Sequence, residues 1–453
     1  MRKLAALLAL LAVLGMASAQ VQVRWFVGLG AGTDEPLFVA QRAIVDEFNA
    51  SQSAVRLVLE IVDNNQAYDV LATQIAAGNA PDIVGPMGIR GGAAFPGVWL
   101  DLEPLIASTD YDLSDFDPAM VDFYRTADGV IGIPFAVFPS YITYNKALFD
   151  EAGLPYPPAS YGEPYVDENG VARTWDVDAL TDLALKLTVD ANGNDATEAG
   201  FDINRVVQWG FGIMWRDIRG RLSLFGAGNF IDDDGNATMP DHWRTGLSWY
   251  QDAMWKQGFY PNGPYGNSAL LGDGNWFDSG NLAMAQTQLW YAGCCMFTVA
   301  GRNDFDFAAV PSYDGQVTAT VNADTFSITR ASRNPEAAFA ALTFLLSPEI
   351  AGRLNALYGG MPARLSLQEA YFGAFEERNF PGRNLNWDVV AAGLSHPDVP
   401  NHEANLPAFR QAEDRYNAFT QRLDNEPGFD LATEIDRLIA ELQLIFDAAR
   451  TRN

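Results

Sequence analysis

The stretch 129–153, GVIGIPFAVFPSYITYNKALFDEAG, decides how this chain is divided. Its first half is rich in Val, Ile and Phe and carries Pro134 and Pro139, which predicts an extended segment that cannot bend freely. Its second half changes to helical periodicity, since Asn145 can cap a short helix that ends at Gly153. A stiff strand that leads directly into a new helix indicates a crossing between two lobes.

Length and charge limit the classes of function. A chain of 453 residues favours more than one domain, and a hydrophobic content of 48% is sufficient for globular packing. Acidic residues outnumber basic residues by 57 to 29, which gives a formal net charge of -28 at pH 7. This charge argues against nucleic acid and against an anionic membrane surface as partners. Its simplest interpretation is an acidic surface that keeps the protein in solution.

Residues 1–19 have the pattern of a secretory signal peptide. The basic start MRK precedes the apolar run 4–14, and ASA at 17–19 supplies the small residues that a signal peptidase reads. We therefore expect the mature chain to begin at Gln20 and to be periplasmic. No cysteine follows the leader, so a lipid anchor is not expected.

The segment after the leader alternates between strand and helix patterns. The expected strands are 21–27, 55–62 and 82–84, and the expected helices are 35–49 and 66–77. This order predicts a parallel α/β sheet with right-handed crossovers, in which ligands collect at the carboxyl ends of strands. The Gly-rich turn after the first strand does not complete a dinucleotide-binding fingerprint, because Thr33 stands at its last position.

Later segments also contain both helix and strand patterns. Helices are expected at 178–189, 240–257, 335–345, 348–358 and 431–449, and strands at 282–289, 306–311 and 325–329. The clusters 190–195 and 232–236 contain fragments of a calcium loop without its full ligand set, so Asx or hairpin turns explain them better. The adjacent Cys294 and Cys295 either form a vicinal disulfide or remain free thiols, and no zinc-ligand spacing surrounds them.

Five stretches occur in one order along the chain. They are AAGNAPDIV at 76–84, GIPF…YNKALFDEAGLP at 132–155, DSGNLAM at 278–284 followed by Trp290, SRNPEAAFAALTFLLSPE at 332–349 and GGMPAR at 359–364. Together they resemble the family 1 extracellular solute-binding proteins of ABC importers, the maltose-binding-protein-like group. The resemblance spans nearly the whole mature chain.

The resemblance implies an α/β, two-lobe periplasmic-binding-protein fold of type II, with a ligand cleft between the lobes. Three crossing segments would join the lobes, at 132–139, near 322–325 and at 359–364. Lobe one would comprise 20–135 and 325–358, and lobe two 136–324 and 359–453. The implied protein is a monomer that closes by hinge motion on a carbohydrate and delivers it to the ABC permease. It would use no cofactor, no metal and no catalytic residue.

A sugar offers hydroxyls for hydrogen bonds and a flat C–H face for aromatic rings. The ligand-binding candidates follow an expected strand, lie in a family motif or an expected ligand loop, or combine an aromatic ring with neighbouring arginines. They are Trp25, Asp34, Arg90, Phe138, Trp215, Arg216, Trp290, Tyr291, Asp324 and Arg364. Arg90 and Arg364 could equally form surface ion pairs. Phe138 departs from the family, since some relatives carry a polar group there, so stacking should dominate. A disulfide at Cys294-Cys295 would add an apolar patch beside Trp290.

Two alternatives remain. The same fold could bind a non-sugar solute, such as a polyol, a glycerol phosphate ester, a peptide or an iron chelate. The acidic charge disfavours polyanions, although Arg216, Arg219 and Arg221 could provide a local exception. A secreted glycoside hydrolase would need two carboxylates at a fixed separation. The sequence has no G-x-S-x-G or H-E-x-x-H motif, so other hydrolytic chemistry is not indicated.

Overall fold

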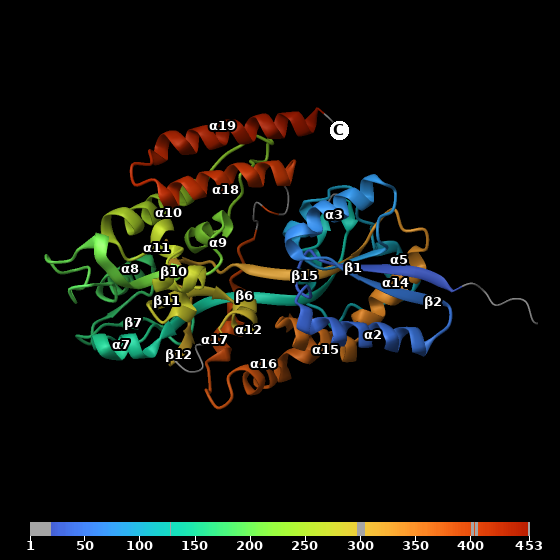
Figure 1. Ribbon diagram of the computed structural model, residues 1–453, viewed down its shortest axis with the longest axis horizontal. Coiled ribbons are helices and arrows are strands. Elements are labelled where there is room, and N and C mark those ends of the chain that lie inside the picture. The colour runs from blue at the N-terminus through green and yellow to red at the C-terminus, as the bar shows by residue number, and fades with distance from the viewer. Residues whose placement is uncertain (1–19, 127, 297–303, 400–402, 404–405, 452–453) are drawn as a thin grey trace, which may run out of the picture. The chain divides into compact units, whose positions relative to one another are not determined.

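The computed structural model describes residues 20–126, 128–296, 304–399, 403 and 406–451 (Figure 1). The expected signal peptide lies outside these described residues. The chain divides into two compact units. Unit 1 comprises the described parts of Met1–Gly88, Phe95–Phe135 and Asp324–Leu357, and unit 2 comprises Ile89–Ala94, Ala136–Ala323 and Tyr358–Asn453. The lobe boundaries expected from the sequence stay a prediction, and Ile89–Ala94 clusters with unit 2 although the sequence places it in lobe one.

Unit 1 is built on a mixed sheet. Its strands, in spatial order, are β2 (Val55–Ile61), β1 (Val21–Val27), β3 (Ile83–Gly88) and the end of β15 (Val321–Ile328). The central β1 pairs in parallel with both neighbours, and Trp25 lies opposite Leu59 and Ile83. The antiparallel β15 pairs with β3, with Ile328 opposite Ile83. The parallel α/β alternation expected near the start of the chain is confirmed.

Helices and short strands complete unit 1. They are η1 (Glu35–Leu37), α2 (Phe38–Ser51), α3 (Asn64–Ala76), α5 (Glu103–Ser108), α6 (Pro118–Asp122), β4 (Arg125–Thr126), β5 (Gly129–Val130), α14 (Pro335–Leu345) and α15 (Pro348–Tyr358). Asp63 caps α3 by accepting the backbone N–H of Asn65. Asp34 and Asn334 occupy N-cap positions without a side-chain cap bond.

The stretch that decides the fold forms one long strand and one helix. β6 (Ile133–Asn145) is buried along its whole length, as its Val-, Ile- and Phe-rich sequence requires. The side chain of Asn145 accepts the N–H of Ala147 at 3.1 Å and so caps α7 (Lys146–Ala152). Gly153 ends this helix in the left-handed region with φ 66°. The chain thereby passes from unit 1 into unit 2 along β6.

Unit 2 contains a second group of paired strands. β6 is followed in spatial order by β11 (Leu282–Gln288), β10 (Val206–Ile213) and β9 (Val189–Asp190), while β12 (Phe305–Ala308) and β16 (Met361–Pro362) also pair with β6. β10 and β11 run parallel, with Ile213 opposite Gln286. β11 and β6 run antiparallel, with Gln288 opposite Ser140. The carboxyl ends of β10 and β11 therefore lie at one edge of the sheet.

Unit 2 also contains most of the helices of the chain. They are α4 (Ile89–Ala93), α7, α8 (Val177–Lys186), η2 (Ile203–Arg205), α9 (Ile218–Leu222), η3 (Ser223–Phe225), α10 (Asp241–Asp252), η4 (Ala253–Gln257), α11 (Gly263–Gly266), η5 (Ala269–Gly274), η6 (Phe277–Ser279), α12 (Leu289–Cys294), α16 (Leu365–Asn379), α17 (Trp387–Ala392), η7 (Gly393–Ser395), α18 (Phe409–Asn425) and α19 (Leu431–Arg450). The short pairs are β7 (Tyr165–Val166) with β8 (Ala172–Arg173), and β13 (Ser312–Tyr313) with β14 (Gln316–Val317).

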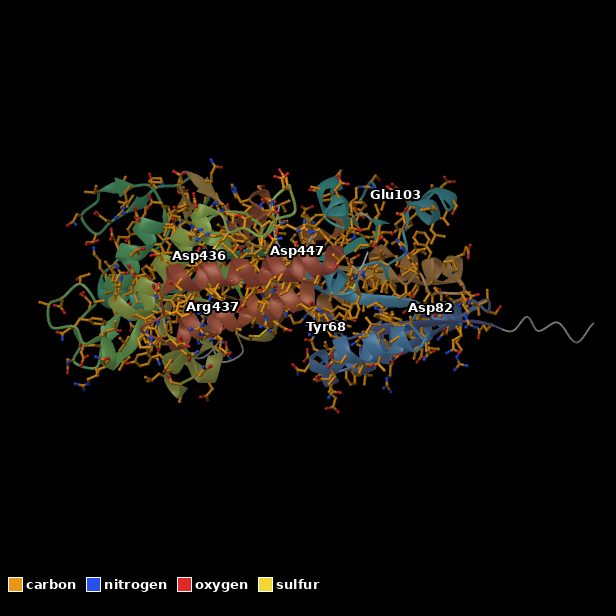
Figure 2. All side chains as sticks on the ribbon, turned by 90° about the horizontal axis from the view of Figure 1, so that it is seen from above. Tyr68, Asp82, Glu103, Asp436, Arg437 and Asp447 are labelled. Carbon is orange, nitrogen blue, oxygen red and sulfur yellow. A yellow bond between two sulfur atoms is a disulfide. The ribbon has the colours of Figure 1, made fainter. Side chains whose placement is uncertain are left out.

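The two C-terminal helices, α18 and α19, lie side by side in both views (Figures 1 and 2). Ile435, Leu438, Leu442 and Phe446 form the buried face of α19 and confirm most of the inner stripe expected there. The labelled Arg437 lies on its exposed face (Figure 2).

Among the described residues no single helix is both long and apolar enough to cross a membrane. The helices α14 and α15 meet that criterion only as a joined pair bent by 69°.

The two clusters of Asp, Asn and Gly form turns. The side chain of Asp190 accepts backbone N–H groups of Asn192 and Asn194 at 2.8 and 3.0 Å. Asp232 accepts the N–H of Asn236 at 2.7 Å. These are Asx-type contacts, as the sequence indicated.

Close packing explains the Gly-rich turn after β1. A Cβ added to Gly30 would lie 2.6 Å from the carbonyl oxygen of Pro86 and 3.2 Å from Oδ2 of Asp324. A Cβ on Gly28 would lie 2.7 Å from that of Ala67. Glycine is therefore needed because the turn lies directly against its neighbours in unit 1, and no nucleotide is needed to account for it.

We predict that Gly30→Ala destabilises the protein by about 1–3 kcal/mol, because the backbone oxygen of Pro86 cannot move aside cheaply. Urea unfolding followed by circular dichroism measures this change. Gly373→Ala is the control, since nothing lies within 4 Å of a Cβ at that helical position. A Gly30→Ala protein as stable as the wild type would contradict the packing argument.

Candidate functional site

Two candidate aromatic residues meet at the edge of the unit 2 sheet. Trp215 follows the end of β10 by two residues, and Trp290 follows the end of β11 by two residues. Because these strands are parallel neighbours, both side chains leave the sheet at the same edge. Their ring centroids lie 5.3 Å apart with an interplanar angle of 84°, an edge-to-face contact. Trp215 is 38% exposed and Trp290 is partly exposed, so this tryptophan pair presents aromatic surface to solvent.

The helix α12 carries the second tryptophan and the cysteines. Tyr291 is buried and its hydroxyl donates to Oδ1 of Asn275, so the expectation that Tyr291 faces a ligand is not supported. Cys294 follows Trp290 by four residues and so lies on the same helix face, where it is exposed. Cys294 and Cys295 are joined by a disulfide, which resolves the alternative that the sequence left open.

Arg216 turns away from the tryptophan pair. Its Cζ lies 4.4 Å from the ring centroid of Trp276, a cation–π contact. Burial lowers the pKa of the Arg216 guanidinium. Within the part of the chain that the structure describes, no carboxylate forms an ion pair with it. A half-buried guanidinium without a counter-ion is unusual in a protein of this acidic charge.

Arg216 borders a cavity of about 330 Å³ that lies within unit 2. The lining is rich in amides and hydroxyl groups, and we call it the amide pocket; it comprises Arg216, Asp217, Pro261, Asn262, Gly263, Asn267, Trp276, Asn417, Thr420, Gln421, Asp424 and Asn425. Asn417, Gln421 and Asn425 recur every four residues on α18 and so share one helix face. This pocket was not predicted from the sequence, although the four-residue spacing of these amide residues is visible there.

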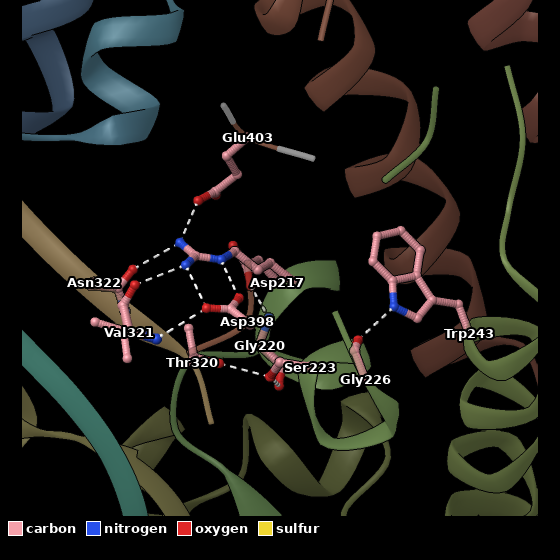
Figure 3. Close-up of polar contacts among 11 residues, drawn as sticks. Asp217, Gly220, Ser223, Gly226, Trp243, Thr320, Val321, Asn322, Asp398 and Glu403 are labelled. Carbon is pink, nitrogen blue, oxygen red and sulfur yellow. Dashed lines mark hydrogen bonds and ion pairs between the residues drawn. The ribbon is translucent and has the colours of Figure 1, made fainter. Parts of the chain in front are cut away.

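Arg219, on α9, is at the centre of a buried ion network. Figure 3 labels its partners Asp398, Glu403, Val321 and Asn322. Its guanidinium donates to both carboxylate oxygens of Asp398, at 2.7 and 2.9 Å, and to Glu403 at 2.7 Å. It also donates to the carbonyl oxygen of Val321 and to Oδ1 of Asn322, at 2.9 and 3.0 Å. The exposed fraction of its side chain is only 3%, so Arg219 stabilises the fold and is not open to a ligand.

Two more arginines have carboxylate partners. Arg221 forms a two-point contact with Asp424, at 2.6 Å for each nitrogen–oxygen pair. Arg90 on α4 forms an ion pair with Glu413 on α18, and burial raises the pKa of that carboxyl group. Of the two roles that the sequence allowed for Arg90, the structure shows the ion pair.

Three further candidates are buried. Trp25 is fully buried and its indole N–H donates to the carbonyl oxygen of Gly85 at 2.7 Å. Phe138 is 4% exposed, and a Cβ on Gly360 would lie 2.8 Å from its ring. Arg364 is 8% exposed. Trp25 packs into the core of unit 1, which corrects the expectation for that residue; for the buried Phe138 and Arg364, contact with a ligand stays a prediction.

The two remaining candidates lie in unit 1; they are Asp34, which is exposed, and Asp324. Asp324 lies beneath the Gly-rich turn, where its carboxylate accepts the backbone N–H of Ala31. Burial raises the pKa of Asp324 to about 7. The carboxyl group is therefore partly protonated at neutral pH and can both donate and accept a hydrogen bond.

We predict that the free energy of unfolding falls as the pH rises from 5 to 8. An unfolded Asp has a pKa of about 3.9, so the folded chain holds this proton more tightly, and its stabilising effect is lost as the pH passes the folded value. Asp217 acts in the same direction, since burial and the charge of Glu403 raise its pKa to about 6.

Asp324→Asn should reduce this loss between pH 5 and pH 8 by about 1–3 kcal/mol, because the amide does not ionise. Urea unfolding at both pH values measures the difference, and Asp34→Asn at an exposed position is the control. An unchanged pH dependence in Asp324→Asn would contradict the raised pKa.

Known proteins resemble this chain in sequence pattern and in fold. The family model described as "Bacterial extracellular solute-binding protein" matches residues 37–352. A search of curated protein sequences finds no match.

Solved structures match almost the whole chain. The ABC substrate-binding protein Lmo0181 from Listeria monocytogenes, in complex with cycloalternan, has a TM-score of 0.69 at 19% identity, covering 93% of this chain and 98% of that chain. The sugar-binding protein MalE from Xanthomonas citri has a TM-score of 0.68 at 16% identity, covering 95% and 98%. Maltose-bound MalE3 from T. maritima has a TM-score of 0.66 at 17% identity, covering 94% and 99%.

At these identities the structural likeness establishes the fold, which is that of the two-lobe periplasmic binding proteins. The family model spans well over half of the sequence. The chain therefore belongs to the bacterial extracellular solute-binding proteins, the family 1 solute-binding proteins of ABC transporters.

Proposed function

We propose that this protein binds a carbohydrate, a mono- or oligosaccharide, in the periplasm and delivers it to an ABC permease as a monomer without chemical turnover. The observation that carries the proposal is the tryptophan pair at the carboxyl ends of β10 and β11. Indole rings pack well against the flat C–H face of a pyranose. Similar structures whose titles name cycloalternan, maltose and mannotriose support this choice of cargo.

The arrangement of arginines weakens the case for an anionic cargo. The sequence suggested that Arg216, Arg219 and Arg221 together could attract a polyanion. Arg219 and Arg221 are instead held by carboxylates inside unit 2, which corrects that expectation and leaves only Arg216. A neutral, hydroxyl-rich cargo fits this balance of charge better.

Three carboxylates near α9 are also poorly suited to glycoside hydrolysis. Asp398 and Glu403 are bonded to Arg219, and Asp424 is bonded to Arg221. A general acid or nucleophile must reach the glycosidic bond, and these groups are held in ion pairs. We therefore propose binding and transport, with hinge motion at the segments that connect the units.

A thermal-shift screen of mono- and oligosaccharides tests the proposal directly, since a ligand that binds only the folded state raises the Tm. We predict that Trp215→Ala and Trp290→Ala each weaken binding of the identified sugar about 10- to 100-fold, measured by titration calorimetry. Tyr156→Ala is the control, because Tyr156 has the same 38% exposure as Trp215. Absence of any sugar hit, or sugar hydrolysis on incubation, would contradict the proposal.

The disulfide gives a separate prediction. It shares the exposed face of α12 with Trp290, so we expect it to contribute apolar surface to the sugar site. The double variant Cys294→Ser, Cys295→Ser should bind the sugar about 3- to 10-fold more weakly, because two polar hydroxyls replace that surface. Calorimetry with the wild-type protein as reference measures the change. Equal affinity would show that the disulfide does not contact the sugar.

A further inference from the structure

We infer that the amide pocket binds a small zwitterion, a free α-amino acid, at a site separate from the tryptophan pair. The carboxylate of the ligand would bind Arg216, and its ammonium group would bind Asp424, which borders the same cavity on α18. The inference goes beyond the proposed function and does not depend on the identity of the cargo. The pocket lies within unit 2, and Arg216 turns away from the tryptophan pair onto Trp276.

Arg216 supplies a positive charge that has no partner. Its side chain is half-buried, and it forms no ion pair or side-chain hydrogen bond among the residues that the structure describes. Removing a guanidinium from water is unfavourable unless other groups replace the lost hydrogen bonds. A ligand carboxylate can accept two parallel hydrogen bonds from this group and so replace them.

Packing holds the guanidinium of Arg216 in place before a ligand arrives. Trp276 is buried, and its indole N–H donates to the carbonyl oxygen of Gly266 at 2.7 Å. The Cζ atom of Arg216 lies 4.4 Å from the centroid of this fixed ring. A donor that is already ordered loses little entropy on binding, so Trp276 acts as a positioning residue.

Asp424 supplies the opposite charge. Each of its carboxylate oxygens accepts one hydrogen bond from Arg221, at 2.6 Å. A carboxylate has about four lone-pair sites, so Asp424 can accept from a further donor. Burial lowers the pKa of Arg216, and the charge of Asp424 acts against this change, although the two side chains form no ion pair. The two groups are therefore near each other without direct contact, and a ligand with opposite charges on neighbouring groups can bridge them.

The balance of charge at the pocket selects a zwitterion over a simple ion. Arg221 and Asp424 neutralise each other, while Arg216 and Asp217 add one positive and one negative charge. Burial and the charge of Glu403 raise the pKa of Asp217 to about 6, so this carboxyl group is mainly ionised at neutral pH. A simple anion would be repelled by the two aspartates, and a simple cation by the two arginines. A zwitterion presents each of its charges to an opposite partner.

Unused amides and the size of the cavity restrict the ligand further. Asn417 and Gln421 are exposed on α18, and their side-chain amides form no hydrogen bond within the described part of the chain. They lie on the same helix face as Asp424, because the three residues are four and three positions apart. The volume of about 330 Å³ lies at the lower end of the range of ~300–1,000 Å³ found for ligand pockets. The pocket therefore suits a small polar amino acid.

Thermal-shift measurements and titration calorimetry on the purified protein test the site with glycine, serine and asparagine. Acetate and methylammonium are the control probes, since each carries only one of the two charges. We expect at least one amino acid to raise the Tm, and both control probes to bind at least about tenfold more weakly than that amino acid.

Variants locate the binding. Arg216→Gln should weaken the amino acid about 10- to 100-fold, and the double variant Asn417→Ala, Gln421→Ala about 3- to 10-fold. The double variant changes only exposed side chains, so it keeps the test valid if Arg216→Gln misfolds. Arg415→Gln is the matched control, because Arg415 is an exposed arginine on α18 outside the pocket.

Each outcome decides the inference. Amino-acid binding that both pocket variants weaken, and that Arg415→Gln and Trp290→Ala leave unchanged, bears it out. Absence of binding by all three amino acids overturns it. Acetate that binds as tightly as the amino acids would also overturn it, by making the pocket an anion site. Equal weakening by Trp290→Ala would overturn it as well, by placing the amino acid at the tryptophan pair. The sugar screen tests the proposed function separately.

Discussion

The buried guanidinium of Arg219 determines how the edge of unit 2 is built. All five of its N–H groups are used, by Asp398, Glu403, Asn322 and the carbonyl oxygen of Val321. Breaking one partner of such a buried pair typically costs about 3–5 kcal/mol, because a charge is left without compensation. The network fixes α9, and the residues just before α9 carry the exposed tryptophan and the stacked arginine. The rigidity of the candidate site therefore depends on an interaction that no ligand contacts.

Much of the fold could be predicted from local sequence pattern. The long apolar run of β6, the cap at Asn145 and the left-handed Gly153 are each encoded within a few residues. The strand and helix alternation after residue 20 likewise identified the parallel pairing of β1 with β2 and β3. Asp34 and Asn334 are residue types that favour N-caps, yet neither side chain forms a cap bond, because whether such a bond forms depends on backbone geometry outside the helix.

Only part of the candidate site could be predicted from the sequence. Trp290 follows an expected strand, so position after a strand was a useful guide there, whereas Trp215 was selected by its arginine neighbours and the strand before it, β10, was not expected from the sequence. The same rule failed for Trp25, because an aromatic residue at a strand end packs into the core as readily as it faces solvent. The amide pocket combines α11 and α18, which are far apart in sequence, and only tertiary packing brings them together.

The sequence separations within the Arg219 network have a consequence for biosynthesis. Arg219 and Asp398 are 179 residues apart, and Arg219 and Glu403 are 184 apart. A ribosome makes Arg219 long before either acidic partner exists, so the buried positive charge cannot be neutralised by them until most of the chain has been made. Contacts of such long range slow folding. We therefore expect the Arg219 network to close late in folding, after the C-terminal part of the chain has been made.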